Sequence, residues 1–166
     1  MKQVLAKRFQ KLAMLELLNG VVIFPGFLIF MSRNVPITIY SILALLTVSV
    51  LLIIGTIFFF LKSRDLKNRT NTLQHYETAF RALRWIIPLA LLIVFIILYG
   101  NIFANRTIDT DNLPDIVIRS LLFLLAVLEY INYFHLQLMY DNQKDLAYLM
   151  RHKRLKQGVM VREFNW

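Results

Sequence analysis

Four apolar runs dominate the sequence, and they limit the folds that the chain can adopt. They cover residues 12–32, 36–61, 85–104 and 116–140. At about 1.5 Å per residue, a helix of this length crosses a hydrocarbon core of roughly 30 Å. None of the runs alternates between polar and apolar residues, as the strands of a membrane barrel do. The sequence therefore predicts an all-α integral membrane protein, a four-helix up-and-down bundle.

The composition supports this class. Hydrophobic residues make up 58% of the chain and charged residues 17%, against about 45–50% and about 25% in soluble domains. The basic segment 1–11 precedes the first run as in a secretory signal, but no small-residue cleavage pattern follows. The first run is therefore interpreted as a retained transmembrane helix.

Lysine and arginine are distributed very unevenly over the segments between the runs. Segments 1–11, 62–84 and 141–166 hold 16 of them, whereas segments 33–35 and 105–115 hold only Arg33 and Arg106. Because basic segments stay inside, both termini are predicted to be cytoplasmic, in a multi-pass protein of the plasma or bacterial inner membrane. The acidic outer loop 105–115, with Asp109, Asp111 and Asp115, is too short to form a domain.

The cytoplasmic segments carry helical patterns of their own. In the basic loop 62–84, apolar residues recur at helical spacing from Leu73 to Leu83, which predicts an amphipathic helix that runs into the third span. The fourth helix is expected to extend into the cytoplasm as far as Gln157. Gly158 would end it, and residues 159–166 would be extended.

The basic tail suits a membrane surface or a protein partner. The residues expected to contact anionic lipid headgroups or a partner are Arg151, Lys153, Arg154 and Lys156. Alternatively, the basic segments only set the topology. The expected partners are the bilayer, its anionic headgroups on the cytoplasmic side, and other membrane subunits or a second copy. Nucleic acid is not expected, because no binding module fits these segments.

Ionisable residues inside the spans are costly there and mark candidate sites. Arg119 follows Asp115 by four residues near the outer surface, so a snorkelling ion pair explains it. Glu16 is expected roughly 6 Å, and Glu129 roughly 9 Å, from the inner boundary. If the first and fourth helices are neighbours, their polar stripes meet, and Gly20 allows close approach. The predicted intramembrane polar layer comprises Glu16, Asn19, Glu129, Asn132, Tyr133 and His135.

Two carboxylates in a low-dielectric layer would keep at least one of them protonated near neutrality. A proton, a metal ion or a cationic solute could supply the missing positive charge. The alternative is a structural clamp, hydrogen-bonded across the helices.

Signatures of enzymes are missing. The sequence has no His-Glu-x-x-His, no Gly-x-Ser-x-Gly, no phosphate-binding loop and no cysteine. His135 is the only histidine within a span, so paired haem ligands are not expected. We therefore expect no enzyme, no catalytic residues, no metal and no cofactor.

Two functions remain. The first is an accessory or scaffolding subunit of a membrane complex or homo-oligomer. The second is a small proton- or cation-coupled transporter or channel that uses intramembrane Glu16 and Glu129. The first predicts a dry, closed bundle, and the second predicts a water-accessible cavity that reaches both carboxylates.

Overall fold

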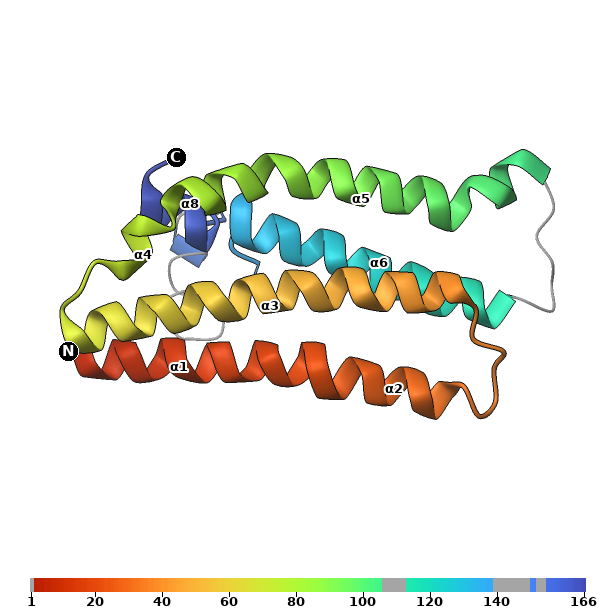
Figure 1. Cartoon of the computed structure of the whole chain (residues 1–166), viewed down its shortest axis with the longest axis horizontal. Helices are drawn as coiled ribbons and strands as arrows, with labels where there is room; N and C mark the ends of the chain where they lie inside the picture. The colour runs from red at the N-terminus through yellow and green to blue at the C-terminus, as the bar shows by residue number, and fades with distance from the viewer. Residues whose placement is uncertain (1, 106–112, 139–149, 152–154) are drawn as a thin grey trace.

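Four long helices run alternately in opposite directions and place both termini at one end of the molecule, as Figure 1 shows. The computed structural model describes residues 2–105, 113–138, 150–151 and 155–166. In these ranges, four helices are long and apolar enough to cross a membrane: Gln3–Met31, Ile39–Asn68, Glu77–Gly100 and Leu113–Phe134. The prediction of an all-α fold with four long apolar helices is confirmed. We call the end that holds the termini the terminal end.

The first long helix consists of α1 (Lys2–Leu18), a π-turn η1 (Asn19–Ile23) and α2 (Phe24–Met31). The basic N-terminal residues are thus helical too. Pro25 has no N–H and crowds the carbonyl four residues back, so the chain widens before it. The N–H of Phe24 bonds the carbonyl of Asn19 instead. The Ser49 hydroxyl of the next helix donates to the Gly20 carbonyl at 2.8 Å, so the widened turn remains satisfied.

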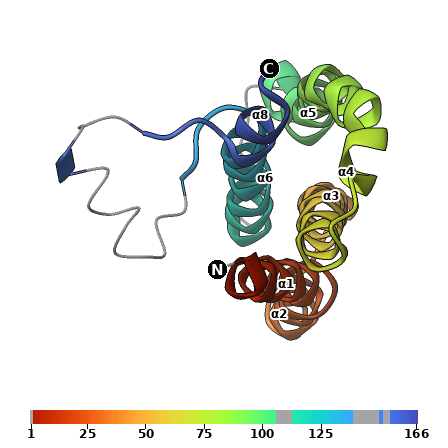
Figure 2. The ribbon, with the colours of Figure 1, turned by 90° about the vertical axis from the view of Figure 1, so that its left-hand side faces the viewer.

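The second long helix, α3 (Ile39–Asn68), is the centre of the bundle. Both α1 and α6 (Leu113–Phe134) pack chiefly against α3, and much less against each other. The end-on view in Figure 2 shows α3 and α6 between α1 and α5. The expectation that the first and fourth helices are packed neighbours therefore needs correction. A Cβ at Gly20 would lie 3.2 Å from Leu52 of α3, so this glycine serves the α1–α3 contact.

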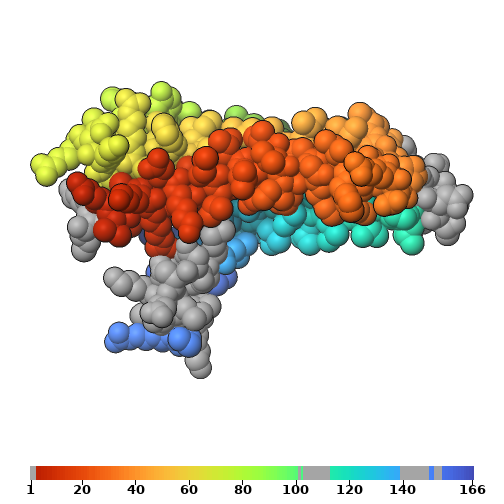
Figure 3. Space-filling model, turned by 90° about the horizontal axis from the view of Figure 1, so that it is seen from below, coloured from red at the N-terminus to blue at the C-terminus, as the bar shows by residue number. Residues whose placement is uncertain are grey.

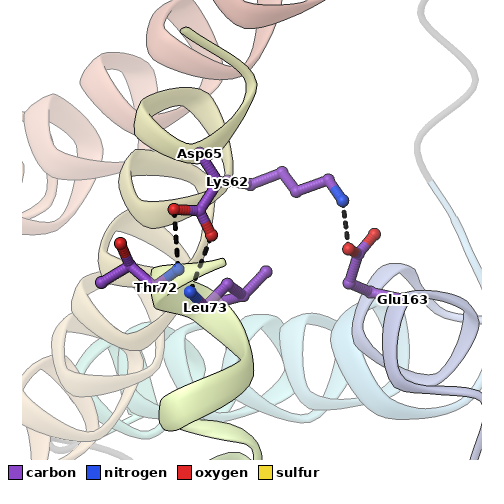
Figure 4. A network of polar contacts seen from close by, with 5 residues as sticks. All are labelled: Lys62, Asp65, Thr72, Leu73 and Glu163. Carbon is purple, nitrogen blue, oxygen red and sulfur yellow. Dashed lines mark hydrogen bonds and ion pairs between the residues drawn. The ribbon is translucent and has the colours of Figure 1, made fainter. Parts of the chain in front are cut away.

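A short connection leads from α3 through α4 (Thr72–His75) into α5 (Glu77–Asn105). The Asp65 carboxylate accepts the N–H groups of Thr72 and Leu73 at 2.9 and 2.7 Å (Figure 4). These donors belong to the first turn of α4, where no carbonyl of the helix can accept them. Leu73 and Phe80 are buried. The segment that the sequence predicts as amphipathic is thus helical, in two pieces that are separated at Tyr76, whose side chain is exposed.

A proline ties α5 to α6. Pro88 lies inside α5 and leaves the carbonyl of Arg84 without its usual helical donor. The hydroxyl of Tyr130 on α6 donates to that carbonyl at 3.0 Å. The Tyr130 hydroxyl thus offsets part of the destabilisation that Pro88 causes in α5.

The C-terminal segment folds back on the bundle. Helix α6 ends at Phe134 instead of residue 140, and Leu136 then forms an antiparallel bridge with Gln157. After the bridge, α8 (Val159–Phe164) begins. Both tail predictions, a helical extension to Gln157 and extended residues 159–166, are wrong.

Two contacts explain the fold-back. The Asn132 side chain accepts the N–H of Leu138 at 2.9 Å, which turns the chain away from the helix axis. Gly158 packs so closely on this turn that a Cβ would lie 2.6 Å from the Tyr133 carbonyl oxygen. Met160 and Val161 then become buried. Asp109, Asp111, Lys153 and Arg154 lie outside the described residues.

Candidate functional site

Polar side chains of α1 and α6 meet over a glycine of α3. A Cβ at Gly55 would lie 2.0 Å from Oε2 of Glu16 and 2.3 Å from the hydroxyl oxygen of Tyr133. Gly55 therefore provides the space in which these side chains approach each other. Gly55 was not among the predicted site residues, although a small residue in the middle of an apolar span is a known sign of close packing.

The two polar atoms at this point are buried and lack a well-aligned hydrogen bond. Glu16 is 7% exposed and Tyr133 is 0% exposed. Among the described residues, neither Oε2 of Glu16 nor the Tyr133 hydroxyl forms a well-aligned hydrogen bond, although the hydroxyl lies within interaction distance of both Glu16 and Glu129. Leaving buried polar atoms unpaired costs about 1–3 kcal/mol each. The pair can therefore accommodate a small partner such as a proton, a cation or a water molecule.

Glu129 adds a second carboxylate. It is half-buried one turn before Tyr133 and interacts electrostatically with both Glu16 and the Tyr133 hydroxyl. The side-chain nitrogen of Asn132 is 3.4 Å from Oε2 of Glu129. The structure thus brings together four residues of the predicted polar layer: Glu16, Glu129, Asn132 and Tyr133.

The other two predicted members lie apart from this cluster. Asn19 is half-buried in the π-turn η1, almost one helical turn beyond Glu16. His135 is exposed just after α6, with its Nε2 at 3.0 Å from the Tyr130 hydroxyl. That hydroxyl also bonds the Arg84 carbonyl. His135 therefore belongs to the α5–α6 contact.

A cavity of about 360 Å³, which we call the vestibule, connects Glu16 with the terminal end. Glu16 and Asn132 line its inner part, whereas Arg8, Lys62 and Arg162 are among the residues nearer the termini. Residues of α1, α3 and α8 form its walls. Glu129 is not part of the lining, so the vestibule reaches one of the two carboxylates. The cavity predicted for a transporter, one that reaches both carboxylates, is therefore present only for Glu16.

The C-terminal helix covers the vestibule. Glu163 of α8 pairs with Lys62 of α3 (Figure 4), and both line the cavity. Arg162 donates to the side-chain oxygen of Gln137 at 3.2 Å. Phe164 stacks on Phe80 with ring centroids 5.9 Å apart. Specific contacts thus hold α8 at the end of the vestibule that lies near the termini.

Trp166 completes this attachment. Its ring stacks on Phe164 at 5.0 Å, and its indole N–H donates to Glu77 at 3.2 Å. Of the basic tail residues expected to contact lipid, Arg151 is exposed and Lys156 is half-buried. The carbonyl of Lys156 accepts the N–H of Gln137 at 2.8 Å.

The opposite end of the bundle holds a fully paired carboxylate. Asp115 is 1% exposed. One of its oxygens accepts the N–H of Thr38 at 2.9 Å and the Ser41 hydroxyl at 2.7 Å, and the other accepts the Thr38 hydroxyl at 2.7 Å.

The expected ion pair between Asp115 and Arg119 is absent from the described contacts, and the snorkelling interpretation needs correction. Arg119 is buried, with its guanidinium 5.3 Å from the ring centroid of Tyr40 and 5.6 Å from that of Tyr99. Aromatic faces attract a guanidinium at such distances. Arg119 therefore points between aromatic rings of two other helices.

In the described residues, no three histidine, aspartate or glutamate side chains are placed to hold a metal ion together. The chemistry that this part of the chain offers is proton or cation binding by Glu16 and Glu129, with a tyrosine hydroxyl between them.

No protein-family model, no curated protein and no solved structure matches the chain.

Proposed function

We propose that this protein is a small proton- or cation-coupled membrane transporter or channel, in which Glu16 binds the coupling ion and Tyr133 and Glu129 assist. One observation carries the proposal. Oε2 of Glu16 and the Tyr133 hydroxyl are buried side by side without a well-aligned hydrogen bond among the described residues, at the inner end of the vestibule.

The charge distribution supports a cytoplasmic vestibule. The terminal end carries the basic N-terminal residues and the basic α3–α5 connection. Basic segments are retained on the cytoplasmic side. In a plasma or bacterial inner membrane, the vestibule would then open to the cytoplasm, and a proton would reach Glu16 from that side.

The arrangement allows one positive charge to be shared. Two carboxylates this close repel each other when both are ionised, so a proton or a cation at the pair is favoured. The Tyr133 hydroxyl can donate to whichever carboxylate lacks the proton. Beyond Gly55, buried apolar residues such as Val48, Leu122 and Ala126 close the bundle. Release to the other side therefore requires a helix movement, for which the π-turn η1 is the natural hinge.

Proton uptake into vesicles tests the proposal. The purified protein is reconstituted in liposomes with an internal pH dye, and a pH gradient is imposed. We expect uptake above that of protein-free vesicles, and Glu16→Gln should reduce it to the protein-free rate. Glu77→Gln is the matched control, because Glu77 does not line the vestibule and the oxygen of a glutamine can still accept the Trp166 indole N–H. Full uptake by Glu16→Gln would contradict the role of Glu16.

A second observation favours an accessory or scaffolding subunit. An apolar groove of about 250 Å³ runs between α3 and α5, with Val50, Ile54, Ala90 and Val94 among its lining residues. A helix of a larger complex or of a second copy could pack there. If wild-type vesicles take up no more protons than protein-free ones, this function replaces transport. Ala90→Trp, which fills the groove, should then release the co-purified subunit, whereas Gly100→Ala should not.

A further inference from the structure

A second groove lies on the other flank of α1. It measures about 540 Å³ and runs between α1 and the half of α3 near the termini. In Figure 3, α1 crosses the face toward the viewer, with the end of α3 above it and α6 below it. The vestibule lies between α1 and the α6–α8 side, so the two cavities are separate.

The residues that line the groove change from polar to apolar along its length. Lys7, Gln10 and Lys11 line it near the terminal end, with Phe60 of α3 at the same level. Met14, Leu17 and Thr56 continue it further into the apolar part of the bundle. Positions 7, 11, 14 and 17 follow helical spacing, so they share one face of α1. Both lysines are exposed. Unlike the vestibule, which Glu16 and Glu163 line, this groove has no acidic residue in its described lining.

We propose that this groove is a binding site for an anionic phospholipid of the leaflet at the terminal end. The phosphate would lie between Lys7 and Lys11, which are one helical turn apart, with the Gln10 amide as an additional donor. One acyl chain would begin beside Phe60 and follow Met14 and Leu17 past Thr56. The distance from Lys11 to Leu17 along the axis, roughly 9 Å, matches the step from headgroup to acyl chain.

The shape of the groove favours a lipid over a free phosphate. A soluble phosphate would use only the lysine end and leave the apolar walls uncovered. The two lysines attract an anionic headgroup and give no advantage to a zwitterionic one, in which a cation accompanies the phosphate. The site does not depend on transport, because Glu16 faces the other flank of α1.

Native mass spectrometry of the detergent-purified full-length protein tests the site. Phosphatidylglycerol and phosphatidylcholine of equal chain length are added in equal amounts. We expect a retained phosphatidylglycerol adduct on the wild type. The double variant Lys7→Gln with Lys11→Gln should reduce that adduct to the phosphatidylcholine level.

The matched control removes the same charge elsewhere. Arg64 and Lys67 are exposed at the end of α3 and do not line the groove, so Arg64→Gln with Lys67→Gln should retain the adduct. An excess of inorganic phosphate should not displace the lipid. Equal loss in both double variants, or displacement by phosphate, would overturn the proposal. Circular dichroism melting of the double variants verifies that both are folded.

Discussion

The two ends of the bundle differ in how completely a buried carboxylate is hydrogen-bonded. Asp115, at the end opposite the termini, accepts three hydrogen bonds from Thr38 and Ser41. Glu16, toward the terminal end, is also buried, but its Oε2 forms no well-aligned hydrogen bond among the described residues. The same kind of group is thus fully hydrogen-bonded in one place and only partly hydrogen-bonded in the other.

The position of each carboxylate relative to helix ends explains the difference. Thr38 directly precedes α3, where backbone N–H groups have no acceptor within the helix. Asp115 can therefore use a backbone donor in addition to two hydroxyls. Glu16 faces Gly55 in the middle of α3, where the N–H groups already bond to carbonyls of the same helix. Only side chains, a water molecule or a bound ion can then satisfy Glu16.

The largest effect is expected for Asp115→Ala. Three donors would lose their acceptor, at about 1 kcal/mol or more each, so we expect a loss of about 2–4 kcal/mol in unfolding free energy. Thermal unfolding in detergent, followed by circular dichroism, measures it. Glu16→Ala is the comparison and should cost less. If Glu16→Ala is the more destabilising of the two, the contrast between the ends is wrong.

Gly55→Ala should affect the site around Glu16, toward the terminal end. Its Cβ would collide with Oε2 of Glu16 and the Tyr133 hydroxyl, and overpacking of this kind costs about 1–3 kcal/mol. We expect proton uptake to be lost together with a lower melting temperature. Gly26→Ala is the control, because a Cβ there meets nothing within 4 Å. Unchanged proton uptake in Gly55→Ala would show that the space at Gly55 is not needed for the function of the site.

Tyr133→Phe tests whether the Tyr133 hydroxyl is unpaired or forms a hydrogen bond that stabilises the fold. Removal of an unpaired buried hydroxyl should leave stability unchanged or raise it by about 1 kcal/mol. Proton uptake should nevertheless fall, since the donor between the carboxylates is gone. Melting curves and vesicle uptake on the same preparation provide both readouts. A clear loss of stability would mean that the hydroxyl is a structural tie, as the oxygens of Asp115 are.

Of the variants expected to destabilise the protein, Phe164→Ala should do so least. It removes ring contacts that hold α8 over the vestibule, such as that with Phe80, at about 1 kcal/mol. Access to the vestibule should increase. Because the chain has no cysteine, one introduced at Leu12, which lines the vestibule, can be labelled with a thiosulfonate reagent.

Labelling at position 12 should be faster in Phe164→Ala than in the same cysteine protein with Phe164 retained. A cysteine at Met14, in the groove on the other flank, should react at the same rate in both backgrounds. Equal rates at position 12 would show that α8 does not restrict the vestibule.

The four long apolar helices and the proximity of Glu16 to Glu129 could both be predicted from the sequence. Both follow from local quantities, because hydropathy is summed along the chain and each helical residue advances by about 1.5 Å. The amphipathic stretch around Leu73 and Phe80 was predictable for the same reason.

Tertiary structure alone decided which helices are neighbours and where α6 ends. Hydropathy continues to Tyr140, but the Asn132 side chain and Gly158 turn the chain after Phe134. Likewise, Gly55 matters only because α3 packs against both α1 and α6. These features depend on contacts between residues far apart in sequence, and the free energy of such contacts does not appear in any local pattern.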